Sequence, residues 1–209
     1  MTNFQKRILT SLIAFPLSIF FVVKGGYFLA FFLIFILFAG MHELFSVFKK
    51  IKSILLLSSI LILSLFSIYY LSERADLLLY FVIGVTVSSD IGGYVFGKIF
   101  KWKKLTKISP KKTISGVFGS YFFSIIFLFI WNEFYSPGSV VNIKAFLITI
   151  IFSTVAQLGD LIISYFKRQD KIKDTGKILP GHGGIFDRID GLMFVVIATF
   201  VFFKLDLIP

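Results

Sequence analysis

The sequence predicts an all-α, polytopic integral membrane protein, a bundle of about seven transmembrane helices with two basic cytoplasmic loops. Three observations support this fold class. First, 57% of the 209 residues are hydrophobic, well above the roughly 45 to 50% of ordinary soluble domains. Second, the apolar residues form runs long enough to cross a bilayer. Third, Lys and Arg are concentrated in alternate connections between those runs, as cytoplasmic loops require.

Each expected span is a run of mostly apolar residues of about the length that crosses the hydrocarbon core, about 20 residues. The runs lie near residues 8–23, 27–47, 53–72, 77–97, 114–132, 145–166 and 192–208. The first run is short and contains Pro16, so we expect a tilted, kinked or partly inserted helix. Its basic start resembles a signal peptide, but no small-residue cleavage site follows, which predicts a retained span.

The basic residues predict the orientation. Of the 22 Lys and Arg residues, 18 fall on one side of the seven spans and four on the other. The positive-inside rule then places the N-terminus in the cytoplasm and the C-terminus outside, in the cytoplasmic (inner) membrane. This topology, with attraction to anionic lipid headgroups, accounts for the net charge of +11, and no nucleic-acid partner is expected.

The chain shows no linker or internal repeat, so we expect a single membrane-embedded domain over residues 1–209. The N-terminal helices would occupy 1–75, and the helices and loops that carry the functional site 76–209. The absence of cysteine excludes disulfides, thiolate ligands and a cysteine nucleophile. A metal ion would therefore be bound by oxygen or histidine ligands.

Three of the eleven acidic residues, Glu43, Asp90 and Asp160, lie in or near expected spans. Ionisable groups at membrane depth are costly, which makes them candidates for function. For Glu43, the favoured interpretation is an interfacial carboxylate paired with a nearby lysine such as Lys49. This interpretation assigns Glu43 no role in the site.

Asp160 begins a polar stripe on the sixth span. Asp160, Ser164, Lys167 and Arg168 are spaced to lie on one side of a helix, which brings a carboxylate, a hydroxyl and two cations together. A simpler interpretation is an ion pair between Asp160 and a lysine that holds the helix end in place. Both interpretations stay open from the sequence.

The stretch "KDTGKILPGHGGIFDRIDG", residues 173–191, is unusually polar for a connection between apolar runs. Glycines surround His182, and Asp187, Arg188 and Asp190 follow. Glycine lets backbone N–H groups approach a phosphate, and Mg²⁺ prefers carboxylate oxygens completed by substrate phosphates. The stretch therefore suggests a metal and phosphate site, although His182 is equally well explained as a loop residue hydrogen-bonded to backbone.

A second basic loop, residues 98–113, ends in "SPKKT". Taken alone, its lysines are readily explained by the excess of basic residues that cytoplasmic loops carry. Because both basic loops fall on one face and each adjoins a span with an aspartate, an anion site at the cytoplasmic interface is favoured. The segment "GGYVFGKI" is not a P-loop, because Ile99 replaces the Ser or Thr that would hold magnesium and no strand precedes it.

Residues 164–190 closely resemble the signature of the phosphatidate cytidylyltransferases, also called CDP-diacylglycerol synthases. The matching positions are Ser164, Lys167, Arg168, Lys173, Asp174, Gly176, Pro180, His182, Gly183, Gly184, Asp187, Arg188 and Asp190. The segments "SDIGGYVFGK" and "ISPKKTISG" resemble further family blocks in the expected order. The resemblance covers residues 84–200, whereas the N-terminal third is shorter than in typical members and matches only in hydropathy.

This resemblance implies a nucleotidyltransferase that converts CTP and phosphatidic acid into CDP-diacylglycerol and pyrophosphate at the cytoplasmic membrane interface. Such an enzyme serves phospholipid biosynthesis. It further implies Mg²⁺, with a second metal ion as an option, membrane lipids as surroundings, and a homodimer. The lipid phosphate would attack the α-phosphorus of CTP in line, without a protein nucleophile.

The resemblance also assigns roles. Asp160 and Asp187 match the two metal-holding aspartates. Catalytic or supporting roles fall to Asp190, Asp174, Ser164 and His182. Phosphate or nucleotide contacts fall to Lys167, Arg168, Lys173, Arg188, Gly183, Gly184, Ser109, Lys111, Lys112 and Thr113. Asp90 matches an acidic family position, with either a binding or a supporting role.

Three other functions fit the sequence less well. A small membrane transporter with an intramembrane aspartate ion site would suit the polar helices, but the two matching halves of many transporters are not found. A phosphotransferase acting on CDP-alcohols would need a D-G-x2-A-R motif, which is absent. A purely lipid-binding role leaves the cluster of glycines and aspartates unexplained.

Overall fold

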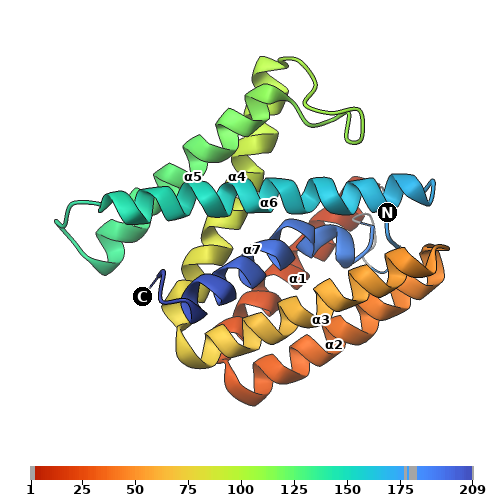
Figure 1. Cartoon of the computed structure of the whole chain (residues 1–209), viewed down its shortest axis with the longest axis horizontal. Helices are drawn as coiled ribbons and strands as arrows, with labels where there is room; N and C mark the ends of the chain where they lie inside the picture. The colour runs from red at the N-terminus through yellow and green to blue at the C-terminus, as the bar shows by residue number, and fades with distance from the viewer. Residues whose placement is uncertain (1–2, 177, 179–182, 209) are drawn as a thin grey trace.

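The computed structural model describes residues 3–176, 178 and 183–208, and within these residues it contains seven helices and no strand. Figure 1 shows their arrangement. The helices are α1 (Asn3–Lys24), α2 (Gly26–Val47), α3 (Ile51–Arg74), α4 (Asp76–Phe100), α5 (Ile114–Tyr135), α6 (Ile143–Gln169) and α7 (Phe186–Lys204). The predicted all-α membrane bundle is confirmed, with one helix for each expected apolar run.

The helices differ in how well they suit a membrane crossing. In the described part of the chain, α2 to α6 are each long and apolar enough to span a bilayer. The apolar part of α1 is shorter, Leu9–Lys24, and the helix continues through Pro16. Helix α7 is not among the five candidates, because its first turns carry Asp187, Arg188 and Asp190. It begins at Phe186, whereas the sequence placed this span near 192–208.

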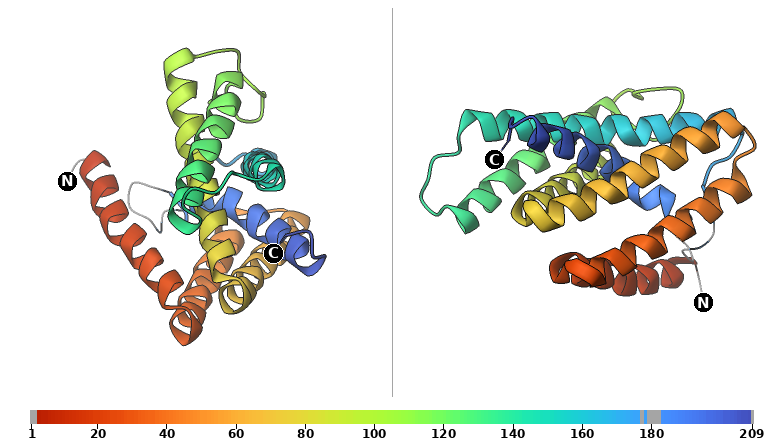
Figure 2. Two further views of the ribbon diagram at one scale, coloured as in Figure 1. Left: turned by 90° about the vertical axis from the view of Figure 1, so that its left-hand side faces the viewer. Right: turned by 60° about the horizontal axis from the view of Figure 1, so that its bottom comes forward.

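The last helix lies in the middle of the molecule. Helix α7 packs against α3, α4 and α6, and both apolar cores include it. Phe186 and Met193 join one core with leucines of α2 and α3, while Val195 and Val196 join the other with residues of α4 and α6. Figures 1 and 2 show α7 alongside α6, with α2 and α3 beyond it.

Helices α4 and α5 form a tight antiparallel pair that rests on glycine. A Cβ on Gly92 would lie 2.1 Å from the carbonyl oxygen of Gly119, and a Cβ on Gly119 would lie 2.3 Å from that of Gly92. The hydroxyl of Ser120 also donates to the carbonyl oxygen of Ser89 at 2.8 Å. Small residues at a membrane helix interface allow this backbone approach. The glycines that mimic a P-loop in the sequence therefore serve helix packing.

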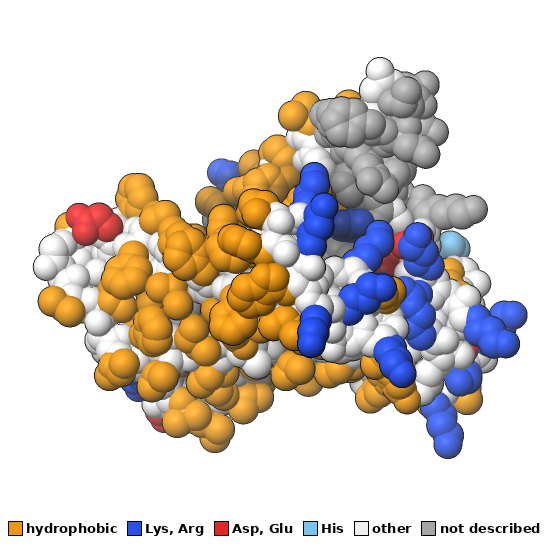
Figure 3. Space-filling view, turned by 90° about the horizontal axis from the view of Figure 1, so that it is seen from above, with side chains coloured by type: hydrophobic (Ala, Val, Ile, Leu, Met, Phe, Trp, Pro, Cys, Tyr) orange, Lys and Arg blue, Asp and Glu red, His pale blue; other side chains and the backbone are white. Residues whose placement is uncertain are grey.

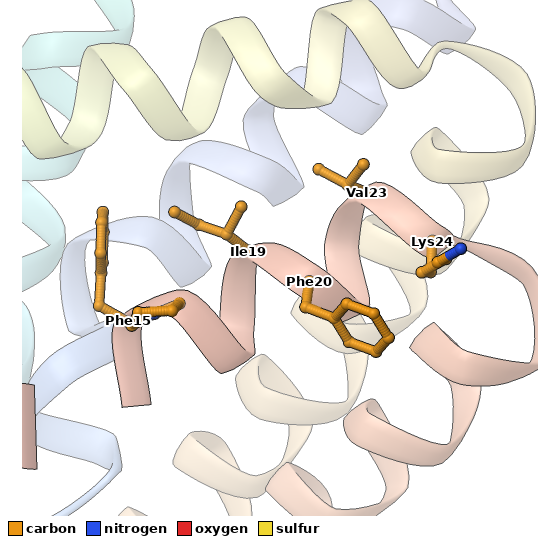
Figure 4. Close-up of a pocket in the computed structure, with 6 residues that line it drawn as sticks. Phe15, Ile19, Phe20, Val23 and Lys24 are labelled. Carbon is orange, nitrogen blue, oxygen red and sulfur yellow. The ribbon is translucent and has the colours of Figure 1, made fainter. Parts of the chain in front are cut away.

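Helix α1 stands to one side of the bundle, next to α2 (Figure 2). One of its faces lines an open groove (Figure 4). The lining residues are Phe15, Pro16, Ile19, Phe20, Val23 and Lys24. This groove is almost entirely apolar, which suits lipid chains and not a nucleotide, so a polar site must be sought elsewhere.

We expect Gly92→Ala to destabilise the protein, because the added methyl group has no space against the backbone of Gly119. Overpacking of this kind costs about 1–3 kcal/mol. Thermal unfolding in detergent measures the change, with Ile91→Ala as the control, since Ile91 is exposed on the same turn. Equal melting temperatures for the two variants would refute the close approach of α4 and α5.

Candidate active site

The two basic loops predicted from the sequence meet in space. The loop between α4 and α5 is closed by a bridge between Lys104 and Thr113. Arg168, near the end of α6, donates from Nε to the carbonyl oxygen of Ile108 at 3.3 Å and from Nη1 to that of Ile172 at 2.7 Å. This side chain therefore ties the loop after α4 to the loop after α6.

The surface over this meeting point is strongly basic. In Figure 3, Lys and Arg side chains gather on one half of the face, an acidic side chain lies among them, and hydrophobic side chains cover the other half. The face is thus divided into an apolar part and a basic part.

Asp160 binds a lysine from the neighbouring loop. Its Oδ2 lies 2.7 Å from Nζ of Lys112, which also donates to the carbonyl oxygen of Gln157 at 3.0 Å. Ser164, one turn along α6, donates to Oδ1 of Asp160 at 3.3 Å. The aspartate side chain remains 34% exposed, so it is open to a ligand. The Asp–Lys ion pair considered from the sequence is present, but its lysine joins two elements instead of holding one helix end.

Asp187, in the first turn of α7, is more fully enclosed. Its Oδ1 lies 2.7 Å from Nζ of Lys167, and both side chains are at most 10% exposed. Its Oδ2 accepts hydrogen bonds from the backbone N–H groups of Thr175 at 2.8 Å and Gly184 at 3.2 Å. Asp187 therefore connects α6, α7 and the loop between them.

Two further aspartates belong to the same neighbourhood. The charge of Asp190 interacts with those of Asp160, Lys167 and Asp90, and the charge of Asp90 interacts with that of Lys112. Asp190 also accepts from the backbone N–H of Gly191 at 2.8 Å. Helices α4, α6 and α7 thus each supply a carboxylate to one polar region.

These residues fit a magnesium ion that substrate would complete. Within the described chain, no group of three or more His, Asp or Glu side chains is arranged to hold a metal by itself. Magnesium usually takes one or two protein carboxylates together with substrate phosphate oxygens. Asp160 and Asp187 each form an ion pair with a lysine at 2.7 Å, and their binding of a metal ion stays a prediction.

Some predicted site residues shape the loops. Thr113 is the N-cap of α5 and accepts from the backbone N–H of Gly116 at 3.1 Å. The carbonyl oxygen of Ser109 accepts from the backbone N–H of Lys112 at 3.0 Å. Gly183 has φ +89°, a conformation that favours glycine, and Gly184 is buried.

The other predicted residues lie at the surface or beyond the described chain. Lys111, Lys173, Asp174 and Arg188 are exposed around the same polar region, where a water-soluble anion has access to them. His182 lies outside the described residues. The predicted roles of these residues in binding remain predictions.

Glu43 is the residue that sequence reasoning missed. The expected interfacial pair with lysine is wrong, because Glu43 is only 1% exposed and accepts from the backbone N–H groups of Ile185 at 2.8 Å and Phe186 at 3.0 Å. An acid inside an apolar run was the available signal. The partners of Glu43 could not be predicted, because every residue except proline has a backbone N–H group and the sequence does not show which of them are close.

Comparison with known proteins gives a consistent family. A model described as the cytidylyltransferase family matches residues 48–206. A protein named phosphatidate cytidylyltransferase from Staphylococcus epidermidis strain RP62A is 40% identical over 131 residues, covering 61% of this chain and 50% of that protein. Proteins of the same name are 43% identical in Staphylococcus haemolyticus (61% of this chain, 50% of the relative) and 44% in Staphylococcus aureus strain COL (60% and 48%). The chain spans about half the length of these curated relatives.

We expect Lys167→Met to destabilise the fold, because Asp187 would keep a nearly buried charge without its cation. Breaking such a pair costs about 3 kcal/mol or more, which corresponds to a drop of about 6–12 °C in melting temperature for a chain of this size. Unfolding in detergent tests this expectation, with Lys49→Met as the exposed control.

The double variant Lys167→Met with Asp187→Asn should recover part of the lost stability, since it also removes the negative charge that Asp187 would keep without a cation. A single Lys167→Met variant as stable as the control would show that the pair contributes nothing to the fold.

Proposed function

The chain belongs to the cytidylyltransferase family, and from this we propose that it is a phosphatidate cytidylyltransferase. It would convert CTP and phosphatidic acid into CDP-diacylglycerol and pyrophosphate for phospholipid biosynthesis. Relatives that carry this name support the proposal. The observation that carries it is the pair of contacts Lys112–Asp160 and Lys167–Asp187, beside the point where the two basic loops meet.

The chemistry requires the protein to bring two anions together. An oxygen of the lipid phosphate forms a bond to the α-phosphorus of CTP, and the bond from that phosphorus to the bridging oxygen of the β-phosphate breaks, so pyrophosphate leaves. Two negatively charged reactants repel each other. Catalysis then consists mainly of positioning and of neutralising developing charge, which suits a site rich in Lys and Arg.

We assign the cations to phosphate binding. Lys112 and Lys167 lie closest to the aspartates and would contact the phosphates at the reacting centre. Lys111, Lys173 and Arg188 are exposed around them and would attract CTP from the cytoplasm. Arg168 keeps the two loops together through backbone carbonyl oxygens, so its first role is to hold the shape of the site.

The carboxylates would hold the metal. Asp160 and Asp187 would bind Mg²⁺, with Asp190 and Asp174 in support. Asp90, on α4, lies near enough to feel the charge of Asp160 and would bind or support from there. When bound, the ion would neutralise charge on the phosphate oxygens. Ser164, which donates to Asp160, would hold that carboxylate in orientation. We also expect a homodimer by resemblance to the family.

Pyrophosphate release from the purified protein in detergent tests this function. We expect release to require CTP, phosphatidic acid and magnesium together, and a chelator to stop it. Asp187→Asn should reduce turnover by at least about 100-fold, more than loss of a supporting contact alone, because one charge at the metal site is removed.

Lys49→Ala is the control for that variant and should retain activity, since Lys49 is an exposed residue between α2 and α3. Near-normal turnover by a folded Asp187→Asn protein would contradict the metal assignment. If the folded native protein releases no pyrophosphate with lipid present, the proposed reaction is wrong and ion transport becomes the alternative.

We further propose that the protein lies in the cytoplasmic membrane with its N-terminus and active site facing the cytoplasm. Thiol labelling can test this cleanly, because the chain contains no cysteine. In intact cells, a membrane-impermeant maleimide should label Val140→Cys, in the exposed α5–α6 connection. It should label Lys107→Cys only after the membrane is opened. The reverse pattern would show that the protein has the opposite orientation.

A further inference from the structure

Glu43 is a buried acid on α2 that reaches across the bundle to the start of α7. We propose that Glu43 is a positioning residue of the active site, which fixes the start of α7 and the preceding loop so that Asp187 faces Lys167. The part of this inference that concerns Asp187 rests on the proposed function. The position of the loop itself does not.

Helix geometry explains why an acid is needed there. The first N–H groups of a helix have no partner within the helix. Ile185, the N-cap of α7, forms no side-chain cap hydrogen bond, and Ile185 and Phe186 are both buried. Glu43 accepts from their N–H groups at 2.8 and 3.0 Å through its two oxygens. A negative charge at a helix N-terminus is also favoured by the helix dipole. A side chain of α2 therefore caps the N-terminus of α7.

Thr175 links this cap to the site. Its hydroxyl donates to Oε2 of Glu43 at 3.4 Å, and its backbone N–H donates to Oδ2 of Asp187 at 2.8 Å. One loop residue thus bonds both acids. A shift of Glu43 would move the loop that holds one oxygen of Asp187, while Lys167 holds the other.

The glycines of the loop make room for this acid. A Cβ on Gly176 would lie 2.7 Å from Oε1 of Glu43, and one on Gly184 would lie 2.6 Å from its Oε2. A Cβ on Gly184 would also lie 2.3 Å from the hydroxyl oxygen of Thr175. These two positions therefore require glycine for packing around Glu43, independently of any approach to phosphate.

Glu43 lies outside the residues that match the family model, which begin at 48. The N-terminal helices thus supply a contact on which the matched part depends. In the structure they do more than anchor the chain, because one of their side chains satisfies the buried end of the central helix.

Hydrogen exchange measures the local effect of this contact without relying on activity. In Glu43→Gln, an amide group of the same size replaces one acceptor oxygen with a donor that faces a backbone N–H. We expect the N–H groups of residues 183–190 to exchange at least about tenfold faster, while α4 and α5 keep their native rates. Glu73→Gln is the matched control, since it removes the same charge from an exposed site.

Magnesium dependence separates positioning from a loss of folded protein. In Glu43→Gln, we expect the magnesium concentration for half-maximal turnover to rise about 10- to 100-fold, and excess magnesium to restore part of the rate. A variant that merely folds less well would lose maximal rate at an unchanged magnesium requirement.

If Glu43→Gln does not fold, Thr175→Val decides the question, because it removes the hydroxyl that donates to Glu43 and keeps a similar shape. It should raise exchange in the same segment by about twofold or more. Native exchange over residues 183–190 in every folded variant would overturn the proposal. Faster exchange in a protein whose native form lacks transferase activity would overturn only the proposed function.

Discussion

The backbone amides at the start of α7 belong to buried residues and need partners inside the bundle, and the rest of the structure is arranged around this constraint. Ile185 and Phe186 donate to Glu43 of α2, while Thr175 and Gly184 donate to Asp187. Because these bonds hold α7 among α3, α4 and α6, they also determine where the aspartates of the last helix lie.

The site is assembled from parts that are held in place in different ways. The pair of α4 and α5 is fixed by direct backbone contact at Gly92 and Gly119, and α7 is fixed by buried acids. The loop that carries Lys112 reaches Asp160 from the first of these units. Asp160 and Asp187 are each paired with a lysine from another element, which keeps opposite charges close without any single element containing the whole site.

Much of the fold was readable from the sequence, because apolar runs of membrane length and a one-sided excess of basic residues leave direct marks. The polar stripe that begins at Asp160 and the motif between residues 164 and 190 likewise pointed to Asp160, Lys167 and Asp187, which the structure places in ion pairs. The role of Glu43 and the early start of α7 were not readable. Both depend on hydrogen bonds to backbone amides across about 140 residues of chain, and such bonds have no residue-type signature.

The close contact of α4 and α5 has a consequence for motion. Two helices whose backbones approach each other this closely at glycine cannot slide past each other without a clash, so we expect α4 and α5 to move together. Any movement of this pair relative to α6 must then break contacts along its length as well as at the loop, such as the hydrogen bonds of Ser89 with Ser153 and of Tyr121 with Thr154, besides the contact of Lys112 with Asp160. A change of shape at the site therefore involves the α4–α5 pair as a whole, and the basic loop is not coupled to α6 through its lysine alone.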